Sequence, residues 1–263
     1  MKVLAITCHP DDAEIYVGGT LCKYARRGDE VTVCHIANGS QGHAVILPDE
    51  LRRLRIREAY EGGRLLGVKE TICLDVNDLE VDSSDRGVVT ALVEVIRHAQ
   101  PDVVFTHSPN DYMKDHVETG KLAFDATFSA SVPHYATAQY MEKQSFAMRQ
   151  PVVGARIGEA PPFALGSQMP AKLVPLYYVD TPSGVGFEPD IYVDITDELE
   201  TKLRAVACHE TQVKWMREHD HVDFPEMVRT FSKNRGYQCG RPYAEGFTAC
   251  RAYPRMPVAG LLP

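Results

Sequence analysis

The chain opens with a short apolar run that stops at a cluster of reactive polar side chains. Residues 3–6, Val-Leu-Ala-Ile, are typical of a strand buried on both faces. His9-Pro10-Asp11-Asp12 follows, and residues 13–27 then show the apolar spacing of a helix. Gly18 and Gly19 in that helix predict close packing against the sheet. Phosphate binding is the weaker alternative, because a nucleotide fingerprint needs glycines in the turn, where His-Pro-Asp-Asp stands.

The order strand, turn and helix recurs along the first half of the chain. Further strands are predicted at 30–37, 71–74 and 103–106, with helices at 48–67, 85–100 and 117–128. This alternation predicts an α/β fold with a mostly parallel sheet. Additional strands are predicted at 173–179, 191–195 and 247–252, and helical segments near 197–207, 213–217 and 226–232.

No repeat or linker divides the 263 residues, so a single domain is expected over residues 1–263. Within it, residues 129–172 are rich in Pro, Gly, Ala and Met, and the later part of this segment has no clear period. We predict that this segment is a mobile lid over the site or an oligomer contact.

Composition narrows the classes of protein that the chain can belong to. Acidic residues outnumber basic ones by 36 to 28, which argues against a general affinity for nucleic acid or anionic membranes. The first apolar run is too short for a signal peptide, and no segment approaches the ~20 apolar residues that span a bilayer. A cytoplasmic protein is therefore expected. Seven cysteines without a Cys-x-x-Cys pair indicate buried, reduced thiols.

A second polar cluster follows the predicted strand at 103–106. It runs from His107 to His116 and contains Asp111 and Asp115. Because the carboxyl ends of parallel strands meet at one edge of a sheet, this cluster and His9–Asp12 are expected to open on the same edge. Ligands bind at that edge in open α/β sheets.

The two clusters together supply a candidate metal site. His9 and Asp12 are three residues apart on a turn, and His116 is the natural third ligand, with Asp115 as a hydrogen-bonding partner of a ligand. Two histidines and one carboxylate leave an open position, which suits Zn²⁺ best, although Fe²⁺, Co²⁺ or Ni²⁺ would also bind. The alternative is that both clusters only form turns and cap helices.

Asp11 is the carboxylate that this ligand set leaves over. From the same turn it can act as a general base toward water that a bound metal has acidified. Attack of that water on a carbonyl predicts hydrolysis of an amide or ester.

Three positions outside these clusters are also assigned an expected role. The polar loop at Asn38 would lie beside the first turn, which makes Asn38 a candidate substrate contact. His209 either reaches the site or forms a structural hydrogen bond at a helix end, and both readings stay open. His35, inside a predicted strand, is expected to be a core residue.

These motifs resemble the LmbE-like (PIG-L) family of N-acetylglucosaminyl deacetylases. The matching segments are His9–Glu14 with Gly18-Gly19-Thr20, Asp115-His116, the helix containing Arg55 and Glu58, His209–Gln212, and Tyr243–Phe247. The resemblance extends over nearly the whole chain, and the first motif is specific in its strand, turn and helix context.

The resemblance implies a Rossmann-like, three-layer fold with zinc held by His9, Asp12 and His116. It implies that Asp11 acts as the general base and that an acetyl or other acyl group is removed from an N-acetylated amino sugar or glycoconjugate. Arg55 falls where the family often contacts substrate. Homo-oligomers, frequently hexamers, are common in the family, so an oligomer is expected. A non-sugar amidase and a catalytically silent sugar- or nucleotide-binding protein remain as alternatives.

One position departs from the family pattern. The family often has a histidine three residues before the last ligand, where it can steady the oxyanion or protonate the leaving amine. This chain has Met113 there, and a thioether can do neither. We expect His209, Tyr112 or Lys114 to supply that role, with Tyr112 and Lys114 also as candidate substrate contacts.

Overall fold

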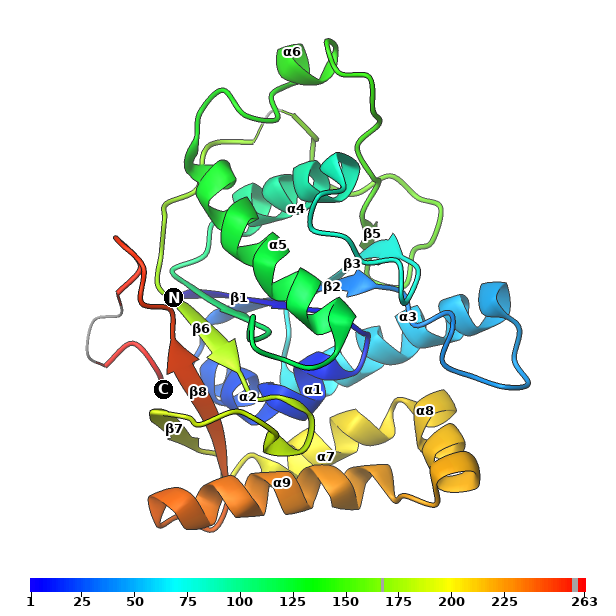
Figure 1. Ribbon diagram of the computed structural model, residues 1–263, viewed down its shortest axis with the longest axis vertical. Helices are drawn as coiled ribbons and strands as arrows, with labels where there is room; N and C mark the ends of the chain where they lie inside the picture. The colour runs from blue at the N-terminus through cyan, green and yellow to red at the C-terminus, as the bar shows by residue number, and fades with distance from the viewer. Residues whose placement is uncertain (167, 257–259) are drawn as a thin grey trace.

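The computed structural model describes residues 1–166, 168–256 and 260–263. Within these residues an eight-stranded sheet has helices on both faces (Figure 1). The strand order is β5-β3-β2-β1-β4-β6-β8-β7, so β1 lies at the centre of the sheet. The predicted α/β fold with a mostly parallel sheet is confirmed.

The parallel part of the sheet contains the strands that the sequence indicated most clearly. These strands are β1 (Lys2–Thr7), β2 (Glu30–Ala37), β3 (Glu70–Val76), β4 (Val103–Thr106) and β6 (Leu176–Val179). The edges are antiparallel additions: β5 (Val152–Val153) pairs with β3, and β8 (Ala244–Ala249) pairs with both β6 and β7 (Ile191–Asp194). β5 was not predicted, because two residues carry no readable period.

Two layers of helices enclose the sheet (Figure 1). One face carries α4 (Arg86–Ala99) and α5 (Lys114–Ser131), whose apolar side chains share a core with β1 to β4. The other face carries α1 (Asp12–Tyr16), α2 (Gly18–Arg26), α7 (Leu199–Ala207) and α9 (Phe224–Cys239). The remaining helices are α3 (Pro48–Leu66), α6 (Ala138–Met141), α8 (Glu210–Trp215), a π-helical turn at Met216–Asp220 and a short 3-10 turn at Pro182–Gly184.

The helix predicted at 13–27 is two helices, and the cause lies far away in the sequence. Val17 leaves the helical conformation with φ −137° and ψ 5°, and α2 begins afresh at Gly18. The free amides at the start of α2 are satisfied by Glu245, whose carboxylate accepts from Gly19 N and Thr20 N at 2.8 Å each. Lys202 Nζ in turn donates to Glu245 at 2.6 Å. A carboxylate at a helix start is a favourable cap, but local pattern cannot reveal it.

The glycine pair packs as the sequence predicted. A Cβ on Gly19 would lie 2.7 Å from the Cβ of Ile195, so only a glycine fits between α2 and the residue that follows β7. Gly18 is less confined, because a Cβ there would meet its nearest neighbours at 3.5 Å, an ordinary contact.

This difference predicts opposite outcomes for two neighbouring substitutions. Gly19→Ala should lower the free energy of unfolding by about 1–3 kcal/mol, because overpacking displaces Ile195. Gly18→Ala, in the same helix, should leave stability unchanged or raise it slightly. Urea denaturation of both variants measures this, and equal losses would show that α2 does not pack as described.

Candidate active site

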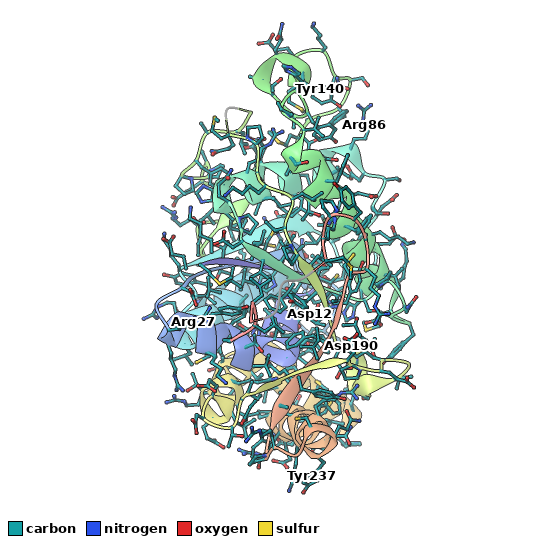
Figure 2. The ribbon with its side chains drawn as sticks, turned by 90° about the vertical axis from the view of Figure 1, so that its left-hand side faces the viewer. Asp12, Arg27, Arg86, Tyr140, Asp190 and Tyr237 are labelled. Atoms are coloured by element: carbon teal, nitrogen blue, oxygen red, sulfur yellow. The ribbon has the colours of Figure 1, made fainter. Side chains whose placement is uncertain are left out.

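The two polar clusters meet because their strands are neighbours. β1 and β4 pair in parallel with Ile6 opposite Thr106, so the turn after β1 and the loop after β4 leave the sheet side by side. Asp12 lies near the middle of the view in Figure 2, and its side chain is almost fully buried. Sequence reasoning therefore placed both clusters on the correct edge.

Three predicted ligand atoms converge on one point. The distance from His9 Nδ1 to Asp12 Oδ2 is 3.4 Å, from His9 Nδ1 to His116 Nε2 is 3.3 Å, and from His116 Nε2 to Asp12 Oδ2 is 3.4 Å. Ligand atoms bonded at ~2.0–2.1 Å to one tetrahedral zinc stand about 3.3–3.4 Å apart. The donor set therefore fits a metal ion with no change in spacing.

The opposite nitrogens of both histidines face carboxylates. His116 Nδ1 lies 2.9 Å from Asp111 Oδ2, and His9 Nε2 lies 3.5 Å from Asp115 Oδ2. A carboxylate at this position favours the tautomer that carries its proton on the nitrogen facing the carboxylate. The other ring nitrogen is then free to bind a metal ion. Asp115 thus lies where the sequence suggested, whereas Asp111 was missed as a partner. Asp111 also accepts from Met113 N at 2.9 Å, which ties the turn before α5 to His116.

His107 is a fourth imidazole beside this trio. Asp12, His107 and His116 form one group that is close enough to hold a metal, and Cys8, His9 and Asp12 form another. His107 Nε2 lies 3.0 Å from Cys8 N and 3.1 Å from Asp12 Oδ2, so this nitrogen is already in contact with the backbone and with one predicted ligand. The His107 ring stacks on His116 with centroids 3.9 Å apart, which makes it a support for the ligand.

The electrostatics of the trio favour a positive charge. Burial disfavours a charged imidazole, but Cys8 and the carboxylates of Asp115 and Asp12 outweigh it and raise the pKa of His9 well above its ordinary value. Burial likewise opposes a charged carboxylate, yet the rings of His116 and His107 hold the pKa of Asp12 well below its usual range. A cation bound among these atoms would satisfy the same preference.

Asp11 lies in the same turn, and an arginine of α3 holds its carboxylate. Its Oδ1 accepts from Arg55 Nη2 at 3.0 Å, and Arg55 Nη1 donates to Gln212 Oε1 at 2.5 Å. Asp11, Arg55 and Gln212 all line the cavity beside the trio. Gly39 makes room for Arg55: it has φ +76°, and a Cβ there would lie 2.9 Å from Arg55 Nε.

The cavity over this site has a volume of about 400 Å³. Its walls come from the turn after β1, α1, the loop after β2, α3, the loop after β3, the start of α5, the 3-10 turn at Pro182–Gly184, and the segment from α8 to α9. The lining residues are His9, Asp11, Asp12, Ile15, Tyr16, Gln41, Gly42, Arg55, Asp78, Leu79, Met113, His116, Pro182, Gln212, Met216, Phe224 and Met227. That size is ordinary for a small-molecule site.

Three predicted substrate contacts are not among the lining residues. Asn38 is buried in its own loop, where its amide donates to Asp75 at 3.0 Å. Tyr112 is 61% exposed, with its hydroxyl 3.5 Å from Pro182 O. Lys114 Nζ turns to Leu79 O at 3.2 Å. Asn38 is thus held within its own loop, whereas Tyr112 and Lys114 bond to backbone carbonyls of two residues, Pro182 and Leu79, that line the cavity.

His209 does not reach the cavity either. It is fully buried, with Nε2 3.4 Å from Glu14 Oε2, and it does not line the cavity. The expectation that His209, Tyr112 or Lys114 replaces the histidine missing at Met113 therefore finds no support in this geometry. The alternative, a structural hydrogen bond at a helix end, is not shown either: His209 precedes α8, but in the described part of the chain neither of its ring nitrogens has a hydrogen-bond partner.

The segment at 129–172 has two parts. The part with α6 lies beyond α4 and α5, and the part with β5 returns to the edge of the sheet, where it pairs with β3 (Figure 1). None of its described residues lines the cavity. The prediction that this segment is a lid or an oligomer contact stays a prediction. In the described part of the chain, no helix is both long and apolar enough to cross a membrane.

Comparison with known proteins agrees with the site. Residues 4–127 match the PIG-L family model, described as GlcNAc-PI de-N-acetylase. The chain is 30% identical over 258 residues to a diacetylchitobiose deacetylase of Thermococcus kodakarensis, covering 93% of this chain and 81% of that protein. It belongs to the PIG-L family.

The fold of this PIG-L chain is also similar to that of solved structures. N,N'-diacetylchitobiose deacetylase from Pyrococcus horikoshii is 29% identical, with a TM-score of 0.70 over 95% of this chain and 84% of that one. GalB, the 4-carboxy-2-hydroxymuconate hydratase of Pseudomonas putida, has a TM-score of 0.71 at 22% identity, covering 98% of this chain and all of that one. The second likeness concerns the fold alone, and it shows that this fold does not fix a reaction.

A buried histidine beside the site makes stability depend on pH. His35 in β2 is a core residue, as predicted, and burial lowers its pKa to about 4. Between pH ~6.5 and 4 the unfolded chain binds a proton at this residue that the folded chain does not, so stability falls as the pH falls.

The free energy of unfolding should therefore drop between pH 7 and pH 5, by about 2 kcal/mol from His35 alone. In His35→Gln this drop should be smaller by that amount. His134→Gln, which alters an exposed histidine, should match the wild type. Urea titrations at both pH values supply the comparison, and an unchanged drop in His35→Gln would contradict the assignment.

Proposed function

We propose that this PIG-L chain is a metal-dependent amidase that removes the acyl group from an N-acylated amino sugar or glycoconjugate. One observation carries the proposal: three potential ligand atoms lie 3.3–3.4 Å apart, and their residues line one cavity together with the carboxylate of Asp11. Such a donor set with an open position is characteristic of hydrolytic sites.

His9 Nδ1, Asp12 Oδ2 and His116 Nε2 would hold the ion. Two imidazoles and one carboxylate suit Zn²⁺ best, and Fe²⁺, Co²⁺ or Ni²⁺ would also bind. When bound, such an ion supplies an acidified water molecule and a polarised carbonyl. Asp111 and Asp115 orient the two imidazoles from behind.

Asp11 takes the proton from the attacking water. Arg55 holds Oδ1 of this carboxylate, so Oδ2 remains to accept the proton. The water oxygen forms a bond to the carbonyl carbon, and the carbon–nitrogen bond then breaks. Because Met113 cannot donate a proton, Asp11 delivers the one it has taken to the leaving amine. This replaces the proton donor that the sequence sought in His209, Tyr112 or Lys114.

An amino-sugar substrate is supported by the relatives and by the polar part of the cavity. The proteins from Thermococcus and Pyrococcus reported above are deacetylases of diacetylchitobiose by name. Gln41, Asp78, Arg55 and Gln212 offer donors and acceptors suited to sugar hydroxyls. A non-sugar N-acyl amine would use the same chemistry, and a silent binding protein has only Met113 in its favour. A cytoplasmic location and a homo-oligomer, such as a hexamer, remain predictions.

Asp11→Asn separates an enzyme from a silent binding protein. The metal-loaded wild type should release free amine from N-acetylglucosamine or a short glycoconjugate. Asp11→Asn should keep one metal ion per chain and lose at least 10²-fold in kcat, because the proton acceptor is gone. Metal analysis, amine release and the melting temperature of both proteins measure this. A folded variant that keeps full activity would exclude Asp11 as the base.

The Asp111 contact predicts an effect on metal affinity. Asp111 accepts from Met113 N with one oxygen and faces His116 Nδ1 with the other. Asp111→Asn replaces one of these oxygens by an amide NH₂, which cannot accept a hydrogen bond from either nitrogen. Metal affinity should fall 10–100-fold. Asp85→Asn is the matched control, because Asp85 also accepts backbone amides but caps α4, away from the site. Competition with a chelator measures both affinities, and equal values would mean that Asp111 does not support His116.

A further inference from the structure

One side of the cavity is apolar and has no part in the chemistry proposed above. Ile15 comes from α1, Met216 from the π-helical turn, and Phe224 and Met227 from α9. All four belong to, or pack against, the core cluster on one face of the sheet, and we call them the apolar wall. Tyr16 also lines the cavity, but its ring lies against His107 and His116, so it belongs with the metal-site residues.

The polar lining residues form a separate group. Gly39 N and Gln41 N donate to Asp78 at 2.8 and 3.0 Å, which joins the loop after β2 to the loop after β3. Arg55 and Gln212 bond to each other beside Gly42. Apart from the metal-site residues, the lining thus comprises these hydrogen-bonding groups, the apolar wall, and three apolar residues on other loops, Leu79, Met113 and Pro182.

This division bears on how an amide substrate lies in the site. The carbonyl carbon that reacts carries two groups, the amine-bearing sugar and the acyl chain. Sugar hydroxyls need hydrogen-bond partners, which the polar side supplies, and an apolar wall that faced hydroxyls would leave them unsatisfied. The acyl chain is then the group that lies along the apolar wall. An acetyl group has a single methyl and would cover little of it.

We propose that the apolar wall binds an N-acyl chain longer than acetyl, so that the preferred substrate is a medium-chain N-acyl amino sugar. This rests on the proposed function and specifies its substrate. Two flexible methionines within the wall, Met216 and Met227, adapt to chains of different length. Met113 adds a third thioether next to the ligand His116, at the position where the family often has histidine.

A series of N-acyl glucosamines tests the proposal. From acetyl through butanoyl to hexanoyl, kcat/KM should rise about threefold for each added methylene that the wall buries, and at least tenfold in total. A second series keeps the acetyl group and lengthens the aglycone from methyl to octyl. If the gain appears in the aglycone series and not in the acyl series, the proposal is wrong.

Two variants locate the effect. Met216→Gln and Met227→Gln keep the side-chain length but place an amide in the wall, so the ratio of hexanoyl to acetyl kcat/KM should fall at least threefold. Met169→Gln alters a methionine that is 75% exposed and does not line the cavity, so its ratio should match the wild type. Equal ratios in all proteins would overturn the role of the wall.

A binding measurement separates this inference from the proposed function. Asp11→Asn is titrated by calorimetry with N-hexanoyl- and N-acetylglucosamine, and the hexanoyl compound should bind at least tenfold more tightly. If the loaded wild type hydrolyses both compounds at one rate and binding shows no preference, only this inference fails. If no amine is released from any member of either series, the proposed function fails, and the binding ratio still decides whether the wall holds an acyl chain.

Discussion

The site depends on keeping three potential ligand atoms, His9 Nδ1, Asp12 Oδ2 and His116 Nε2, within 3.4 Å of one another below the protein surface. Without a cation between them, such an arrangement is costly, because each atom has lost water and faces others with the same need. Neighbouring side chains hold these atoms in position: Asp111 contacts His116, Asp115 contacts His9, and His107 stacks against His116. The central pairing of β1 with β4 brings both halves together.

Asp11 illustrates how the same turn supports two kinds of carboxylate. Asp12 points at the histidines, whereas Asp11, one residue earlier, is turned toward Arg55 of α3. Arg55 is buried, so its charge and that of Asp11 each need the other. The arginine that the sequence suggested as a substrate contact therefore also positions the base.

The sequence predicted those parts of the molecule that local pattern controls. Buried strands such as 103–106 and the turn His9–Asp12 were visible because apolar runs end there in reactive residues. The role of Asp111 was not visible, since a short turn folds it back onto His116. The break at Val17 was equally hidden, because Glu245 caps α2 from the other end of the chain. His209 misled because spacing cannot distinguish a buried histidine that faces Glu14 from one that faces the cavity.

The Glu245 cap has a consequence for the order in which parts of the site become available during synthesis of the chain. The family match ends at residue 127, and by then the chain already contains His9, Asp12 and His116. Lys202, and after it Glu245, the carboxylate that closes the start of α2, are added only in the last third of the chain. A chain emerging from the ribosome therefore contains its candidate ligands and their supports, Asp111, Asp115 and His107, before it contains the residue that caps the neighbouring helix α2. That cap is in place only when β8 joins the sheet.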